Sequence, residues 1–572
     1  MTTSFNTLSK RDRLQQQFSA METERSSFIP HYRELAEFIR PRRGRFTNTD
    51  RNKGDRRYNS IINSMATQAH RSATAGLFAG VASPSRPWFA TETEDPDLMK
   101  WGPVKEWLWK QDLLFRAIFA SSNFYNMFPV LLGELLLFAT GAMSMVEDFN
   151  DVARFYTHTA GSYVIGQNDR YEIDRFGRTM DMTVSQIMEK FGNKGGGADN
   201  SHISTAVRSA YDRGNYHVWF PVNQLITPND EYDDKRLLAK YKKFRSCYWE
   251  PGSNKKDTLL KESGYDEMPV FVPRWEVTGE DIYGTDCPAM TALGDIQGLQ
   301  IMEKRKAQAI DKMVSPPLHG PPTVRNVPVA NLAGGLTIYD GGNESGLRPI
   351  YEVKPQLQDM RADMQEVEQR IKDAFYVNMF LAITDMPGVQ PKNEFQLAQV
   401  NQERLLQLGP PLERLHGELL DQVIERLFHM SLRADILPPI PDELQGQELK
   451  IRYVSSLAQA QRAVVTGGIE RTAAFVTGLS QAFGPDVLDK FNTDKAVDEY
   501  AQAQGAIPTI VRPDEEAVKL RQAREAQQQK MQQLQMAGAA SEMAKNVGDV
   551  DLSKDTPVTR AMEGFQKATG QK

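Results

Sequence analysis

Hydrophobic residues recur every three or four positions over much of the chain, the spacing typical of α-helices that bury one face. Residues 1–40 have this pattern on both sides of Pro30, and Pro41 ends it because proline cannot continue a helix. Small residues dominate a second helical segment at 58–80, and a third runs from about 103 to 146. These patterns predict a largely helical N-terminal region.

Between 147 and 290 the pattern changes to short alternating runs bounded by turn residues, which is typical of β-strands. The clearest runs are Tyr163–Gly166, Tyr171–Asp174, His217–Phe220 and Val270–Val272. The stretch Arg175-Phe-Gly-Arg178 is predicted to be a hairpin turn because it contains a glycine. The chain is therefore predicted to be an α+β protein that is mainly helical.

Two helices are predicted on either side of a segment rich in proline and glycine. The first spans 288–313, the intervening segment 314–353, and the second 355–378. The second helix would be about 36 Å long at 1.5 Å per residue. Its apolar positions alternate spacings of three and four and form a heptad-like seam of Leu357, Met360, Met364, Val367, Ile371 and Ala374. This seam predicts packing between helices.

The remainder is again mostly helical. A loop is predicted at 384–393, followed by a helical stretch from 394 to 437 that Gly409-Pro410-Pro411 must interrupt. Residues 448–454 are predicted to be a strand and 456–500 to be helical. The Gln-rich tail predicts a polar helix from Pro513 to about Asn546, followed by a disordered end.

Composition limits the possible classes of protein. Of the 572 residues, 25% are charged and 40% hydrophobic, as in soluble globular proteins. The 68 Lys and Arg against 74 Asp and Glu leave a net charge of −6, which argues against a protein that coats nucleic acid tightly. Two cysteines, Cys247 and Cys287, exclude a disulfide scaffold and a CxxC metal pair.

The segment 127–146 is apolar enough to suggest a membrane span. Glu134 lies inside it, and Pro129, Gly133 and Gly141 interrupt it, so a buried core helix is the favoured interpretation. A membrane-active protein that uses this segment is the alternative. No secretory signal is predicted, since residues 1–17 lack an apolar core.

Catalytic motifs are missing from the sequence. It has no GxxxxGK[ST] nucleotide-binding loop, no GxSxG elbow and no HExxH zinc motif. Acidic residues cluster at Asp230, Glu231, Asp233 and Asp234, where a metal-dependent nuclease would need converging carboxylates. Neighbouring acids point in different directions, so a solvated turn is favoured over a metal site.

A basic loop at 40–57 is the best candidate from composition for contact with nucleic acid. After Pro41 it contains seven cations and only two acids, Asp50 and Asp55. The alternative, which we favour, is a structural loop that pairs with acidic neighbours.

Short motifs in a characteristic order identify a resemblance. Early motifs are the loop after Pro41, Leu77–Gly80, Ser83–Phe89, Ser122–Phe124 and Phe138–Gly141. Later ones are Asp174–Gly177, Phe191-Gly192, Pro273–Trp275, Ile282–Gly284, Leu408–Leu415 and Leu437–Pro441. Over residues 10–465 this order resembles the head-to-tail connector, or portal, proteins of short-tailed phages, and the C-terminal hundred residues are similar only in character.

The resemblance implies a ring, usually of twelve copies, at one capsid vertex. Double-stranded DNA would pass through its channel during packaging and ejection. The implied parts are a wing at 1–290 with its β-rich part at 147–290, stem helices at 291–313 and 354–378, a clip at 314–353, a tunnel loop at 379–393, a kinked helix and wing return at 394–505, and a crown helix with a flexible tail at 506–572.

The resemblance also implies a structural role without a catalytic residue, metal or cofactor. Its partners would be copies of itself, DNA bound without sequence preference, the terminase large subunit, tail or adaptor proteins, scaffold and the major capsid protein, with no membrane. Its location would be the virion, after assembly in the host cytoplasm. Candidate channel residues are Lys304, Arg305, Lys306, Lys312 and Lys392, and the candidate tunnel loop contains Asp385, Gly388, Lys392 and Asn393.

Overall fold

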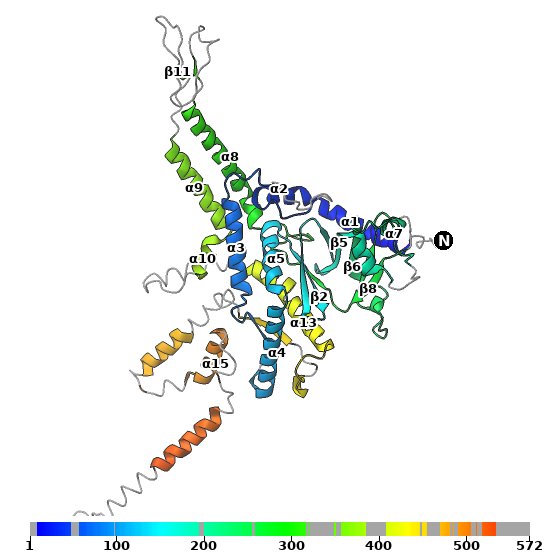
Figure 1. Ribbon diagram of the computed structural model, residues 1–572. Helices are drawn as coiled ribbons and strands as arrows, with labels where there is room; N and C mark the ends of the chain where they lie inside the picture. Colours follow the sequence, from blue (N-terminus) through cyan, green and yellow to red (C-terminus); the bar gives the residue numbers. More distant parts are fainter. Residues whose placement is uncertain are drawn as a thin grey trace, which may run out of the picture. The chain divides into compact units, whose positions relative to one another are not determined.

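Blocks of helices and blocks of strands alternate along the chain in the computed structural model (Figure 1). It describes residues 9–46, 57–95, 98–193, 200–253, 258–315, 318–319, 348–349, 356–384, 408–444, 446, 449–454, 469–480, 484, 490–504, 511 and 517–532. Two compact units are formed by residues 1–92 with 107–468, and by 93–106 with 469–572. The prediction of an α+β protein is confirmed.

Helices make up most of the described residues before position 140. They are α1 (Lys10–Ser26), α2 (Ile29–Ile39), α3 (Met65–Val81), α4 (Gly102–Ser121) and α5 (Phe124–Phe138). Helix α3 packs against α5, where His70 hydrogen-bonds to the backbone of Gly133, and it also buries the small residues Ala66, Ala69 and Ala73. The break predicted at Pro41 is confirmed, since α2 ends at Ile39.

A five-stranded antiparallel sheet has the order β4-β5-β6-β7-β8. Its strands are β4 (Tyr163–Gln167), β5 (Ile173–Thr183), β6 (Trp219–Pro228), β7 (Phe244–Trp249) and β8 (Lys261–Tyr265). Helix α1 covers one face, where Phe18 packs with Val164, Leu225 and Trp249. Helices α6 (Val184–Phe191) and α7 (Thr205–Asp212) pack against the other face near Val222.

Smaller strand groups complete this part of the fold. A three-stranded sheet has the order β3-β2-β9, with β2 (Ala142–Asp148), β3 (Val152–His158) and β9 (Val270–Phe271). Strand β1 (Phe89–Thr93) pairs with β12 (Leu449–Tyr453), which confirms the strand predicted at 448–454.

The hairpin turn predicted at Arg175–Arg178 is wrong, because these residues lie inside strand β5. Gly177 pairs with Leu225 of β6, and Phe18 of α1 lies 2.7 Å from the position that a β-carbon on Gly177 would occupy. The glycine is therefore needed for the close approach of α1 to the sheet. The connection between β4 and β5 lies instead around Tyr171, whose φ is +63°.

The apolar segment 127–146 is part of the core, as favoured by the sequence. Helix α5 ends at Phe138, Ala139 takes a left-handed conformation with φ of 58°, and strand β2 begins at Ala142. The helix predicted to reach 146 is therefore shorter, and the rest of the segment is strand. Among the described residues, no helix combines the length and the apolar character that a membrane crossing requires.

The later part of the first unit contains α8 (Pro288–Val314), β10 (Leu318–His319), β11 (Arg348–Pro349), α9 (Leu357–Ala374) and α10 (Val377–Thr384). Then come α12 (Gly409–Leu415), a π-helical turn η4 (His416–Leu420) and α13 (Asp421–Arg433). The interruption predicted at Gly409 is the first turn of α12, where Pro410 and Pro411 need no helical hydrogen bond. The second unit includes helices at 469–480 and 517–532 and α15 (Thr493–Gln504).

Candidate functional site

Helices α8 and α9 form an antiparallel hairpin that extends beyond the core of the first unit (Figure 1). Helix α8 is buried at Ala289, Ala292, Ile296 and Leu299, whereas none of its residues from Ile301 onward is buried. Beyond the helices, Leu318 pairs with Pro349 and His319 with Arg348, so β10 and β11 lie side by side. The two helices predicted at 288–313 and 355–378 are thus present and adjacent.

The base of the hairpin is held by a buried glutamine that the sequence patterns did not indicate. The side-chain oxygen of Gln300 accepts hydrogen bonds from the backbone amides of Ile62 and Asn63, at 2.7 and 2.8 Å. Asn63 in turn donates to Glu303 of α8 at 3.2 Å and to Glu368 of α9 at 3.0 Å. One loop residue therefore joins both helices to the core.

The apolar seam predicted on α9 is confirmed as a packing surface. Met364, Val367 and Ile371 are buried in the main core cluster, while Met360 is half-buried. Phe375 continues the seam and packs edge-on against His70 of α3. Tyr376 takes a φ of +56° and separates α9 from α10, so residues 379–384, expected in a loop, are helical.

The predicted channel cations do not share one face of α8. Lys304, Arg305 and Lys306 are consecutive, and each is turned by about 100° from the previous one. Lys306 forms an ion pair of 2.7 Å with Glu303, whereas Lys304, Arg305 and Lys312 are exposed. Arg305 and Lys312 are seven positions apart and therefore point in nearly the same direction. The predicted residues Asp385, Gly388, Lys392 and Asn393 lie outside the described residues.

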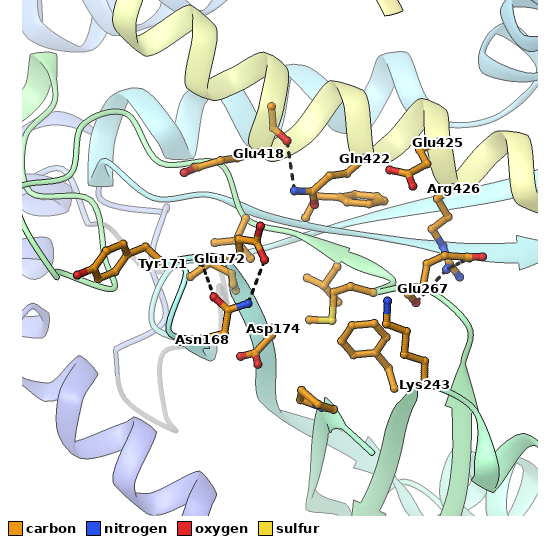
Figure 2. Close-up of a pocket in the computed structure, with 18 of the residues that line it drawn as sticks. Asn168, Tyr171, Glu172, Asp174, Lys243, Glu267, Glu418, Gln422, Glu425 and Arg426 are labelled. Atoms are coloured by element: carbon orange, nitrogen blue, oxygen red, sulfur yellow. Dashed lines mark hydrogen bonds and ion pairs between the residues drawn. The ribbon is translucent and has the colours of Figure 1, made fainter. Parts of the chain in front are cut away.

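A cavity of about 630 Å³ lies between the five-stranded sheet and the helix that runs through η4 and α13 (Figure 2). Two ion pairs tie the helix to the opposite wall. Arg274 lies 2.7 Å from Glu418, and Arg426 lies 3.0 Å from Glu267. Both arginine side chains are almost fully buried, with exposed fractions of 5% and 2%.

The carboxylates around this cavity are held apart or paired. Glu172 accepts a hydrogen bond from Asn168 at 3.0 Å, and burial raises the pKa of Asp174. No set of three metal-ligating side chains occurs among the described residues, either here or at the 230–234 cluster. In that cluster Asp233 pairs with Arg236 at 3.0 Å, at the surface. The two ion pairs across the cavity therefore hold the helix against the sheet region.

The described start of the basic loop is structural. Arg43 donates to the carbonyl oxygen of Val130 at 2.8 Å and lies 3.4 Å from the buried carboxylate of Glu134. Burial raises the pKa of Glu134, and Arg43 opposes this shift by favouring the charged form. This agrees with the favoured interpretation of the loop as far as Phe46, where the described stretch ends.

Three of the short motifs noted in the sequence meet at one point in the fold. The hydroxyl of Thr140 accepts a hydrogen bond from the backbone amide of Gly284 at 2.8 Å. Trp275 donates its amide to the carbonyl oxygen of Ala139 at 2.8 Å. Gly284 is so close to this carbonyl that a β-carbon would lie 2.2 Å from the oxygen. These motifs therefore mark backbone contacts that the fold requires.

A second group of motifs builds an aromatic cluster. Trp88 stacks on Phe124 with ring centres 6.1 Å apart, and Phe119 lies 4.7 Å from Phe124. Asn123 fixes the neighbouring strand by exchanging two hydrogen bonds with the backbone of Phe155, at 2.7 and 2.8 Å. Packing and backbone geometry, rather than catalytic chemistry, explain why such residues occur in this order.

Comparison with known proteins decides the family. The sequence profile described as "Bacteriophage head to tail connecting protein" matches residues 11–511. The chain belongs to this family of head-to-tail connecting proteins. The connector is 38% identical over 551 residues to the "Portal protein" of Salmonella phage epsilon15, covering 96% of this chain and 97% of that protein. It is also 38% identical over 563 residues to the "Probable portal protein" of Bordetella phage BPP-1, covering 97% and 99%.

Family membership confirms the resemblance identified from the motifs. A connector is a structural component of the phage particle, so the protein is not an enzyme. The alternatives of a metal-dependent nuclease and of a membrane-active protein are not supported.

Proposed function

We propose that this protein is the portal subunit of its phage, and that copies assemble into a ring, usually of twelve, at one capsid vertex. The observation that carries this proposal is the similarity to two portal proteins over almost the full length of all three chains. Double-stranded DNA would enter through the ring during packaging and leave through it during ejection.

The helical hairpin supports the assignment of the stem. Helices α8 and α9 would form the channel region, with 291–313 and 354–378 as the two stem helices. The segment 314–353 between them would be the clip, and 379–393 would contain the tunnel loop. Residues 1–290 would form the wing, 394–505 the return to the wing, and 506–572 the crown and its tail.

The nearly balanced charge of the proposed stem suits a channel that does not bind DNA tightly. Residues 301–313 contain Lys304, Arg305, Lys306 and Lys312 against Glu303 and Asp311, which is 4 − 2 = +2. Residues 354–375 contain four cations and five anions, or −1. Weak contacts of both signs would let DNA slide, whereas a strongly basic wall would slow it. Lys392 would add a phosphate contact from the tunnel loop.

The partners follow from this role. The sequence has no GxxxxGK[ST] motif, so a separate terminase large subunit would supply the energy for packaging. Terminase and, later, tail or adaptor proteins would dock at the clip. Scaffold and the major capsid protein would surround the ring during assembly in the host cytoplasm, and the finished ring would be part of the virion.

Electron microscopy and native mass measurement on one purified sample test this proposal. We expect rings with a central hole and a mass near twelve times the 64.6 kDa of one chain. A dimer or a filament without a channel, at any protein concentration, would contradict it.

A further inference from the structure

The outer half of α8 presents a basic face that no described part of the subunit covers. Ile301, Arg305, Gln308 and Lys312 follow the spacing i, i+4, i+7 and i+11, which places them on one face of the helix. All four are exposed, and 51% of the Ile301 side chain is accessible. This basic face begins where α8 leaves the core.

Two glycines extend the basic face toward the core. Gly294 and Gly298 are in the interior of α8, where glycine is less favourable than alanine by about 1 kcal/mol. A β-carbon at either position would meet no atom within 4 Å. No contact within the described subunit therefore requires glycine there, whereas the approach of another backbone would.

Helix α9 has an acidic edge that is also uncovered. Asp359, Asp363, Glu366 and Asp373 follow helical spacing and are exposed. Glu366 is paired with Arg370 at 3.1 Å. Neither Asp359 nor Asp363 forms an ion pair with another described residue, and the same holds for Arg305 and Lys312.

The two uncovered surfaces lie at the same level of the hairpin. Arg370 of α9 lies 3.1 Å from Asp295 of α8, which fixes the antiparallel register. At 1.5 Å per residue, Arg305 is about 15 Å above this pair, and Asp359 and Asp363 are about 10 to 17 Å above it. Opposite charges therefore face outward at equal height without pairing inside the subunit.

We propose that the basic face of α8 docks against the acidic edge of α9 from a second copy of this chain. Such a contact joins different surfaces of the two copies, and contacts of this kind form a ring when the rotation from copy to copy closes. Gly294 and Gly298 let the neighbouring helix approach, Ile301 is covered, and Arg305 and Lys312 pair with Asp359 and Asp363. The inference rests on the proposed ring and names the surfaces that build it.

Charge exchange tests the contact. The double variant Arg305→Glu/Lys312→Glu should assemble at concentrations at least about tenfold higher than the wild type, because like charges then face each other at every interface. Adding Asp359→Lys/Asp363→Lys to the same chain should restore assembly. The control is Lys304→Glu, which makes one such charge reversal about 100° away from Arg305 on the same helix and should assemble like the wild type.

Glycine replacement separates docking from folding. Gly294→Ala/Gly298→Leu should leave the melting temperature of the monomer unchanged or raise it, because the space is open and both new residues favour helix. Ring assembly, followed by native mass measurement, should nevertheless be lost. If the wild type forms rings and the glycine and charge-reversed variants assemble equally well, the proposed docking contact is wrong. The proposed ring would stand in that case. A wild-type chain that forms no rings would overturn the portal assignment as well.

Discussion

Arg274 and Glu418 are 144 positions apart and meet in an ion pair of 2.7 Å at the joint between the sheet region and the helix of η4 and α13. The same guanidinium donates to the carbonyl oxygens of Tyr171 and Ile282, at 3.1 and 3.3 Å. A single buried arginine therefore holds three separate segments.

Replacing Arg274 should weaken the fold strongly. Arg274→Met removes the guanidinium that pairs with Glu418 and donates to two carbonyl oxygens, and breaking a buried pair costs about 3–5 kcal/mol. We expect a loss of this size in the free energy of unfolding, measured by urea titration. Arg414→Met serves as the control, since Arg414 is more exposed and lies 3.4 Å from the same carboxylate. An equal loss in both variants would contradict the role of Arg274.

Gly284 should not tolerate a side chain. A β-carbon there would lie 2.2 Å from the carbonyl oxygen of Ala139, a backbone atom that cannot rotate away. Gly284→Ala should lower the free energy of unfolding by about 1–3 kcal/mol and should lower soluble yield. Gly252→Ala is the matched control because no atom lies within 4 Å of its added carbon. Thermal melting of both variants beside the wild type measures the difference.

His70 should make the fold sensitive to acid. Its Nε2–H donates to the carbonyl oxygen of Gly133, and burial, the largest cause, lowers its pKa from 6.5 to about 3. Between these values the unfolded chain binds a proton that the folded chain does not, so stability falls as the pH falls. One pKa unit corresponds to about 1.4 kcal/mol, so His70 should lower the free energy of unfolding by about 2 kcal/mol between pH 6.5 and pH 5.

His70→Gln keeps a donor for Gly133 and removes this proton. Between pH 7.5 and pH 5 the free energy of unfolding, measured by urea titration, should fall by about 2 kcal/mol less in the variant than in the wild type. His31→Gln changes an exposed histidine and should follow the wild-type curve. Identical pH profiles for His70→Gln and the wild type would show that His70 titrates normally in the fold.

Gln300 should stabilise the attachment of α8 to the loop at 59–64. Gln300→Leu removes the acceptor of the Ile62 and Asn63 amides, and the loss of these two part-buried hydrogen bonds should cost about 1 kcal/mol each. Amide hydrogen exchange should then become faster in the inner half of α8 and in 59–64. Lys304→Leu, an exposed position on the same helix outside the basic face, is the control and should leave exchange unchanged.

The sequence was sufficient for the elements whose periodicity is strong. The structure agrees with the helices predicted at 288–313 and 355–378, with the buried seam of Met364, Val367 and Ile371, and with the break at Pro41. Helix α5 was predicted too long because strand β2 is as apolar as the helix before it, so the pattern shows no boundary at Ala139. Gly177 was assigned to a turn, whereas its small size serves the packing of Phe18.

The candidate site depended on contacts that spacing does not encode. Gln300 looks like any polar helix residue until the amides of Ile62 and Asn63 are brought to it from 237 or more positions away. The cations at 304–306 looked like a cluster in the sequence, but helical rotation separates them around α8. The sequence gives the net charge of a helix, whereas the structure is needed to show on which face of the helix each charge lies.

The pairing of Leu318 with Pro349 means that the chain leaves and re-enters the stem at one place. A segment whose two ends meet can change its length and sequence without moving the helices that carry it. In the proposed ring, a change of docking partner would therefore need changes in the intervening segment alone and would leave the helices around Gln300 where they are.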